Sequence, residues 1–170
     1  MELRWMSNSS ADMLTTWSGL VQPEWVDYNG HLRDAYYLLL FSYATDGLMG
    51  HLGLDEAGRK ATGHSIFTIE AHINYVQEVK SGVAVEVRTQ ILGHDRKRLR
   101  VYHSLHRVGA QPLLAANEQM LVNVDMAGPF STPFAPSVFE VLQVLMAGHQ
   151  SLPKPEYAGR SIALPGERGV

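Results

Sequence analysis

Hydrophobic and polar residues alternate through much of the second half of the chain with a period of two, which is typical of β-strands. The alternation runs through residues 64–75 and resumes at residues 83–91, 99–105 and 114–124. Turn-forming segments such as Ser81-Gly82 and Gln111-Pro112 separate these stretches. Consecutive strands joined by short turns predict a mainly antiparallel sheet. One further short strand is expected earlier, at residues 16–24.

A helical pattern precedes the sheet. From about His31 to Met49 the residues are apolar or aromatic on nearly every side of a helix, which indicates a buried helix. Residues 50–63 contain several glycines and predict a loop or short helical turns, and a last helix is expected over about residues 137–149. Because the apolar helix must be covered, we expect an α+β domain in which an antiparallel sheet wraps around one long central helix.

The 170 residues suffice for one domain with its own core. We expect residues 1–14 to form a flexible N-terminal arm, residues 15–150 to form the domain, and residues 151–170 to form a tail that wraps the surface or is disordered. No stretch reaches the roughly 18 apolar residues that span a bilayer. The N-terminus lacks the basic start and apolar core of a signal peptide. We therefore expect a cytoplasmic protein with no membrane partner.

Charge and cysteine content narrow the possible functions. The formal net charge is −3, and this mild acidic balance argues against nucleic-acid binding. Because the chain has no cysteine, disulfides, thiolate metal sites and cysteine nucleophiles are excluded. His64, Glu70 and His72 share one strand face but have no recognised metal-ligand spacing. We interpret them as surface or interface residues and expect neither a metal nor a cofactor.

Residues 25–34, WVDYNGHLRD, place an acid, a histidine and a glycine in a turn directly before the predicted helix. Unpaired backbone N–H groups at a helix start can stabilise an oxyanion. A carboxylate such as that of Asp27 can attack a carbonyl carbon or activate water. Asp and Asn before a helix are also common caps and turn formers. Residue types and spacing alone leave both interpretations open.

A resemblance to a known family favours the catalytic interpretation. The stretch VQPEWVDYNGHLRDAYYLLLFSYATD resembles the start of hotdog-fold thioesterases of the 4-hydroxybenzoyl-CoA thioesterase superfamily. More narrowly, it and the later stretches FTIEAHINYVQEVKSG, ILGHDRKRLRVYHSLHR and ANEQMLVNVD resemble thioesterases associated with carnitine dehydrogenase, which act on betainyl-CoA. The resemblance covers about Leu20 to Val138. It implies a hotdog fold and hydrolysis of a short acyl-CoA, with betainyl-CoA giving glycine betaine and CoA.

The resemblance also implies roles for residues of the turn. Asp27 matches the family's catalytic carboxylate, and Asn29 and His31 match turn residues that shape the site. His31 either orients the thioester or simply forms hydrogen bonds within the turn. The family's oxyanion donors correspond to the backbone amides of Leu32, Arg33 and Asp34. Many members have Asn where this chain has Arg33, which leaves open whether Arg33 contacts CoA or faces solvent.

Other side chains are candidates for binding the acyl group. Aromatic residues lie near the turn, among them Trp25, Tyr28 and Tyr37. Aromatic faces bind quaternary ammonium groups, although such residues also serve as plain core. Glu118 shares the apolar alternate face of its strand, where a carboxylate is costly unless it is paired. It would attract a cationic acyl group, assist water activation or pair with a buried arginine or hydroxyl.

The basic run of Arg96, Lys97 and Arg98 falls at a predicted turn between two strands. Such a run suits the phosphates of CoA, but it is also typical of a solvated turn that protects a sheet edge. Family sites form between two subunits, so the resemblance implies a homodimer or homotetramer. The rival functions are a thioesterase for another short or aryl acyl group and a protein that binds acyl-CoA without hydrolysing it. A third rival, a hotdog dehydratase, has a motif that we do not find.

Overall fold

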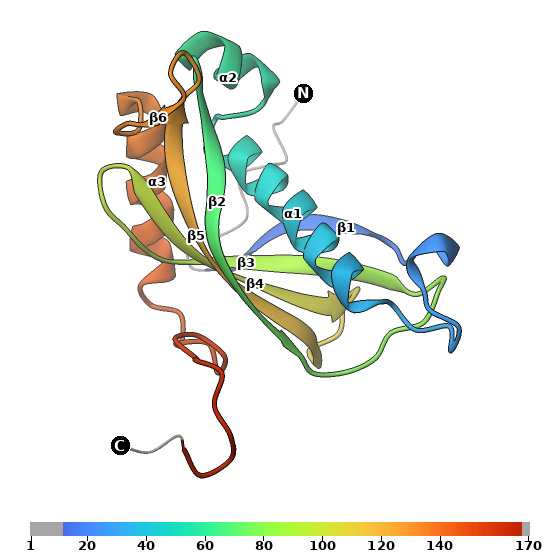
Figure 1. Ribbon diagram of the computed structural model, residues 1–170. Helices are drawn as coiled ribbons and strands as arrows, with labels where there is room; N and C mark the ends of the chain where they lie inside the picture. The colour runs from blue at the N-terminus through green and yellow to red at the C-terminus, as the bar shows by residue number, and fades with distance from the viewer. Residues whose placement is uncertain (1–11, 168–170) are drawn as a thin grey trace, which may run out of the picture.

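A curled antiparallel sheet encloses one side of a long helix in the computed structural model, which describes residues 12–167 (Figure 1). The strands are β1 (Leu14–Leu20), β2 (His64–Tyr75), β3 (Ala84–His94), β4 (Arg98–Arg107), β5 (Leu113–Asp125) and β6 (Phe130–Ser131). The helices are η1 (Pro23–Trp25), α1 (Asp34–His51), α2 (Glu56–Thr62) and α3 (Pro136–His149). The strand order is β1-β3-β4-β5-β2, with β6 beside β5, and every pairing among the described strands is antiparallel.

The ends of two predicted elements differ from the structure. The strand expected at residues 16–24 is β1 at Leu14–Leu20 followed by η1, since Pro23 has no N–H for a strand ladder. The helix expected from His31 begins at Asp34, because His31 and the following residue form isolated β-bridges instead. Leu14, which we assigned to the arm, is buried in the core. Residues 1–11 of the predicted arm lie outside the described residues.

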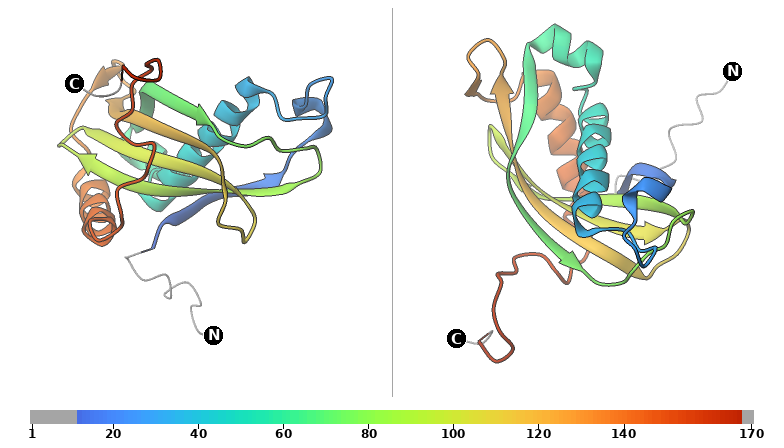
Figure 2. Two further views of the ribbon diagram at one scale, coloured as in Figure 1. Left: turned by 90° about the horizontal axis from the view of Figure 1, so that it is seen from below. Right: turned by 45° about the vertical axis from the view of Figure 1, so that its right-hand side comes forward.

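Consecutive strands do not all pair. Among residues 12–167, β2 pairs only with β5, so β4 and β5 lie between β2 and β3, and no described strand pairs with the second edge of β2. The register shifts between Thr68 and Glu70 in β2 and between Ile91 and Gly93 in β3. Such bulges bend a strand and increase its twist. They account for the curvature with which the sheet follows α1 (Figure 2).

Helix α1 packs one stripe of side chains on the concave face of the sheet. The buried residues recur at helical spacing: Tyr37, Leu40, Phe41, Ala44, Thr45, Leu48 and Met49. On the opposite face Leu38 is 43% exposed and Tyr43 is 37% exposed. The expectation of a helix buried on all sides is therefore wrong for the single chain. The sheet covers only one side of α1.

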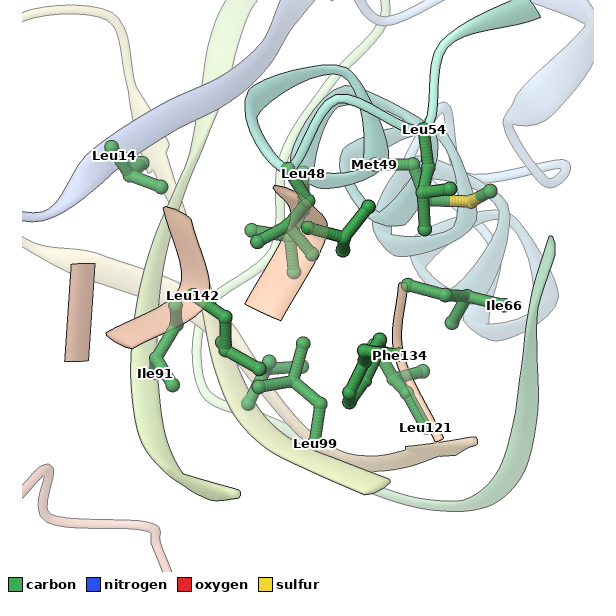
Figure 3. Close-up of a cluster of buried hydrophobic side chains, with 13 residues drawn as sticks. Leu14, Leu48, Met49, Leu54, Ile66, Ile91, Leu99, Leu121, Phe134 and Leu142 are labelled. Carbon is green, nitrogen blue, oxygen red and sulfur yellow. The ribbon is translucent and has the colours of Figure 1, made fainter. Parts of the chain in front are cut away.

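The core has two parts along α1. Around the C-terminal half of the helix, Leu48 and Leu54 belong to one buried cluster with Ile91 and Leu99 of the sheet and Leu142 of α3 (Figure 3). A second cluster surrounds the N-terminal half, where the helix packs on β3, β4 and β5; its buried members include Leu40, Phe41, Val85, Val87 and Leu105. This second cluster supports the turn that precedes α1.

A chain of hydrogen bonds crosses the core from β1 to α1. Thr16 Oγ1 lies 2.7 Å from Thr89 Oγ1, which lies 2.7 Å from His103 Nδ1. On the other side of the ring, Nε2 lies 3.2 Å from Thr45 Oγ1, which donates to Gln119 Oε1 at 3.0 Å. These hydrogen bonds are all satisfied by a neutral imidazole whose Nε2 carries the proton and donates to Thr45 Oγ1, while Nδ1 accepts from Thr89 Oγ1. Burial lowers the pKa of His103 to about 3, so the ring is neutral at neutral pH.

Helix α1 and β1 approach closely at Gly47, where an added Cβ would lie 1.9 Å from Thr16 O. We predict that Gly47→Ala lowers the free energy of unfolding by about 1–3 kcal/mol, the usual cost of overpacking. At Gly50 of the same helix an added Cβ meets no atom within 4 Å. Gly50→Ala is therefore the matched control, and it should leave stability unchanged or raise it by up to about 1 kcal/mol. Urea denaturation measures both, and equal stabilities would contradict the close approach.

Stability should also depend on pH through His103. As pH falls below about 6.5, the unfolded chain binds a proton at this imidazole that the folded protein does not bind. The free energy of unfolding should therefore fall between about pH 6.5 and about pH 3, by up to about 1.4 kcal/mol per pH unit from this group. Urea denaturation across this range should give a shallower pH dependence for His103→Gln than for the wild type. Identical slopes would show that the imidazole titrates normally.

Candidate active site

The segment from Trp25 to Arg33 folds back on itself before α1 begins. Arg33 N donates to Trp25 O at 3.0 Å, and Asp27 N donates to His31 O at 2.9 Å. At the tip, Gly30 N donates to Asp27 O at 2.9 Å, and Gly30 has a φ of 75°, which favours glycine. The segment is therefore a tight hairpin-like turn that leads directly into the helix.

This turn is attached to the connection between β2 and β3. Leu32 N donates to Val79 O at 2.8 Å, and His31 forms a β-bridge with Lys80. The Arg33 side chain folds back on the turn, where Nε donates to Val26 O at 3.4 Å. The backbone of the turn is thus held from both sides.

The two carboxylate oxygens of Asp27 have different surroundings. Oδ1 accepts hydrogen bonds from the amides of Asn29 at 2.8 Å and His31 at 3.2 Å. Oδ2 accepts no hydrogen bond from residues 12–167. The turn-forming interpretation therefore applies to Oδ1, while Oδ2 takes no part in the hydrogen bonds of the turn. Asn29 contributes its backbone amide to this arrangement.

His31 contacts an acidic residue of the β2–β3 connection. Its Nε2 lies 3.3 Å from Glu78 Oε2, and the side chain of His31 is 27% exposed. The contact orients the imidazole away from its own turn and toward the end of β2. The His31 side chain therefore has a partner outside the turn, and its role in orienting the thioester stays a prediction.

The predicted oxyanion donors are only partly available. The amides of Leu32 and Arg33 donate to Val79 O and Trp25 O, so the prediction is wrong for these two residues. The reason is that the backbone pairs as a hairpin up to Arg33, and α1 begins one residue later. The amide of Asp34, at the first position of α1, donates to no atom within the described part of the chain. This amide remains as a candidate donor.

The three predicted aromatic residues lie in different environments. Trp25 stacks on Tyr36, with ring centroids 6.1 Å apart, and Tyr28 is 94% exposed. Tyr37 is buried, and its hydroxyl donates to Gln77 O at 3.2 Å. The structure therefore brings only Tyr37 to the end of β2.

A cavity of about 260 Å³ lies between the start of α1 and the end of β2; it is lined by Leu32, Asp34, Tyr37, Tyr75, Val76, Gln77 and Glu78. The rings of Tyr37 and Tyr75 meet edge to face, with centroids 5.3 Å apart. Burial raises the pKa of both phenols, and the charges of Glu78 beside Tyr37 and Asp34 beside Tyr75 raise it further. Sequence reasoning did not select Tyr75, although it shares the alternate face of β2 with Ile73.

Glu118 lies on the opposite face of the sheet from α1. Its neighbour Gln119 accepts the hydrogen bond from Thr45 of α1, so alternation points Glu118 outward. Glu118 Oε1 accepts from Arg100 Nε at 2.6 Å, and Oε2 accepts from Gly159 N at 2.5 Å. Within one chain Glu118 therefore forms an ion pair with Arg100, whose side chain is 40% exposed rather than buried, on the face of the sheet away from α1. Its role in binding the acyl group stays a prediction.

The C-terminal segment crosses the outer face of the sheet (Figure 2). Tyr157 and Ala158 pack there against Tyr102 of β4 and Ala116 of β5. This packing explains why the face that carries Glu118 reads as apolar in the sequence. The part of the predicted tail from Pro153 to Gly159 thus lies on the surface of the sheet, whereas Ile162 and Leu164 beyond it are 94% and 68% exposed. Residues 168–170 lie outside the described part.

The predicted basic run is divided among three environments. Arg96 lines a cavity of about 220 Å³ beside the start of α3, and Lys97 Nζ donates to Ser131 Oγ at 3.3 Å. Arg98 Nε donates to Asp95 Oδ2 at 2.8 Å. Arg98 also lines, with Arg100, a cavity of about 390 Å³ on the outer face. Of the three residues, Arg98 is therefore best placed to meet a phosphate.

The described residues contain neither a cluster suited to a metal ion nor a helix suited to crossing a membrane. Among residues 12–167, no group of three or more His, Asp or Glu side chains is arranged to hold a metal ion. His64 Nδ1 instead lies 3.2 Å from Asn123 Nδ2, and Glu70 and His72 line a cavity of about 230 Å³ with Arg100. Within the same residues, no helix has the length and apolar character needed to cross a membrane.

Comparison with known proteins identifies the family. The sequence model of the thioesterase-like superfamily matches residues 21–143. A betainyl-CoA thioesterase from Pseudomonas aeruginosa is 56% identical over 155 residues, which cover 91% of this chain and 98% of the relative. An L-carnitine dehydrogenase/betainyl-CoA thioesterase from Agrobacterium fabrum is 40% identical over 142 residues, which cover 84% of this chain but only 29% of that longer protein.

Two solved structures agree with this relationship. A putative thioesterase from Pseudomonas putida has a TM-score of 0.78 at 52% identity, covering 90% of this chain and 97% of that one. A Staphylococcus aureus protein solved in complex with CoA has a TM-score of 0.83 at 28% identity, covering 94% and 100%. The chain therefore belongs to the thioesterase-like superfamily. The predicted hotdog fold is confirmed, and so is the predicted class of activity, thioester hydrolysis.

Proposed function

We propose that this protein hydrolyses betainyl-CoA to glycine betaine and CoA. The observation that carries the proposal is the 56% identity to a betainyl-CoA thioesterase along nearly the whole length of both chains. The longer relatives, in which such a thioesterase is joined to an L-carnitine dehydrogenase, support a role in carnitine catabolism. The Staphylococcus aureus protein in complex with CoA supports the CoA part of the substrate.

Asp27 is the residue that we propose to act on the thioester. Its free Oδ2 either takes a proton from water, which attacks the carbonyl carbon, or attacks that carbon directly to give an anhydride that water then hydrolyses. In both routes the C–S bond breaks, the sulfur leaves as the CoA thiol, and the carboxylate is regenerated. The Asp34 amide at the start of α1 donates to the oxyanion of the tetrahedral intermediate. His31, held by Glu78, helps to orient the carbonyl group.

We further propose a cytoplasmic homodimer in which β2 pairs with β2 of a second copy. The free edge of β2 is 12 residues long, and Phe67 and Ile69 on it are 42% and 58% exposed. Long exposed edges of this kind favour pairing with another chain. A two-fold axis satisfies both copies with the same surface.

Asp27→Asn tests the proposed role of the carboxylate. Asparagine retains an acceptor at the position of Oδ1, so the hydrogen bonds from Asn29 and His31 should persist and the turn should fold. We predict a loss in kcat/KM for betainyl-CoA of at least about a hundredfold, the usual scale of acid–base catalysis. Release of CoA thiol measures the rate, and circular dichroism with a thermal midpoint verifies the fold.

The same assay should include neutral acyl-CoA and aryl-CoA substrates. Wild-type turnover of betainyl-CoA above that of neutral chains supports the proposed substrate. Binding of betainyl-CoA without thiol release would instead indicate an acyl-CoA-binding protein. Near-normal turnover by Asp27→Asn would reject the assignment of the carboxylate.

Arg98→Ala tests the contact with the nucleotide part of CoA. We retain Arg96, Lys97 and Arg98 as proposed phosphate contacts, and Arg98 is the one that faces a cavity with a second arginine. Arg98→Ala should raise the KM for betainyl-CoA by about three- to tenfold, because a charge-assisted hydrogen bond is lost at a half-exposed site.

Two controls make this test specific. Betainyl-pantetheine, which lacks the nucleotide, should show no change in KM with Arg98→Ala. Arg107→Ala removes an exposed arginine at the far end of β4 and should leave both KM values unchanged. An equal rise in KM for both thioesters would place Arg98 away from the phosphates.

A further inference from the structure

The cavity between α1 and the end of β2 has the composition of a cation site. Its lining contains two carboxylates, those of Asp34 and Glu78, and no lysine or arginine. It also contains the two phenol rings of Tyr37 and Tyr75, whose centroids are 5.3 Å apart. Aromatic faces together with carboxylates attract quaternary ammonium groups, which carry a diffuse positive charge and donate no hydrogen bonds.

This cavity adjoins the turn that carries Asp27. Glu78 Oε2 lies 3.3 Å from His31 Nε2, and the amide of His31 donates to Asp27 Oδ1 at 3.2 Å. Two contacts therefore join the cavity to the proposed catalytic carboxylate. In a betainyl thioester a single methylene separates the ammonium nitrogen from the carbonyl carbon. A site for the ammonium group must consequently lie next to the site where the carbonyl reacts.

Resting on the proposed function, we propose that Tyr75 and Glu78, with Tyr37 behind them, hold the trimethylammonium group and set the preference for a cationic acyl chain. Tyr75 supplies the accessible ring, since it is 54% exposed while Tyr37 is 4% exposed. The Tyr75 hydroxyl donates to Asp34 O at 3.3 Å, which orients the ring. Glu78 supplies the negative charge.

The candidates selected from the sequence are less suited to this role. Trp25 and Tyr36 stack on each other, so each ring already uses one of its faces. Tyr28 is 94% exposed and lies outside the lining of the cavity. Both oxygens of Glu118 are occupied by Arg100 and the tail on the outer face. The cavity at the end of β2 is thus the better match for the ammonium group.

Two thioesters of equal shape, one cationic and one neutral, distinguish the effect of the acyl group's charge on hydrolysis from the effect of its size. One is betainyl-CoA, and the other is tert-butylacetyl-CoA, in which a tert-butyl group replaces the trimethylammonium group. The measured quantity is the ratio of their kcat/KM values. We expect the wild type to favour betainyl-CoA by at least about tenfold. Tyr75→Leu and Glu78→Gln should each lower this ratio by about five- to tenfold, whereas Tyr75→Phe, which keeps the ring, should retain it within about twofold.

The outcomes distinguish this inference from the proposed function. A wild type that hydrolyses betainyl-CoA, together with variants that lose activity equally on both thioesters, would overturn the cation site and leave the proposed function intact. A fall in the ratio with Tyr28→Leu but not with Tyr75→Leu would overturn it as well. A wild type without activity on betainyl-CoA would overturn the proposed function and this inference together. Circular dichroism verifies that the exposed substitutions leave the protein folded.

Discussion

The position of α1 on the concave face of the sheet is the constraint on which both the core and the candidate site depend. Gly47 allows the helix backbone to reach β1, and Thr45 connects the middle of the helix to His103 and Gln119. Near the start of the helix, the Tyr37 hydroxyl reaches Gln77 O. These contacts, at Tyr37, Thr45 and Gly47 along α1, restrict both rotation of the helix about its axis and sliding along the sheet. Because the turn with Asp27 leads directly into α1, the position of its carboxylate follows from the same packing.

Much of the fold could be predicted from the sequence because each strand from β2 to β5 has one face directed at α1. The alternation of apolar and polar residues indicates which residues of a strand share a face. The order of the strands in the sheet depends instead on pairing between segments that are distant in the sequence. The free edge of β2 was therefore not predictable from periodicity. The start of α1 was missed for a related reason: Leu32 continues the apolar pattern, but its amide is taken by Val79, more than forty residues later. Strand β6, Phe130–Ser131, is too short to produce a periodic signal.

The candidate site was predictable only in part. Resemblance selected Asp27, and the structure explains why its turn-forming and catalytic interpretations are compatible: a carboxylate has two oxygens, and the turn uses one. Tyr75 and Glu78 come from the end of β2 and beyond, so their proximity to the turn exists only in the folded chain. For Glu118, alternation along β5 could not say which face of the sheet was the inner one. His103, buried beside α1, marks that inner face.

The apolar surfaces that a single chain exposes to water affect how the proposed site binds its substrate. The outer face of α1, the free edge of β2 and the ring of Tyr75 are apolar surfaces in contact with water, at a cost of about 25 cal/mol per Å². Tyr75 is the last residue of β2, so a second copy paired along that edge would lie beside the cavity. Removing water from the cavity would strengthen the attraction between a bound ammonium group and Glu78, because the effective dielectric constant falls. Pairing along the edge of β2 would then bury apolar surface and, by excluding water from the adjoining cavity, also increase the preference for a cationic acyl group.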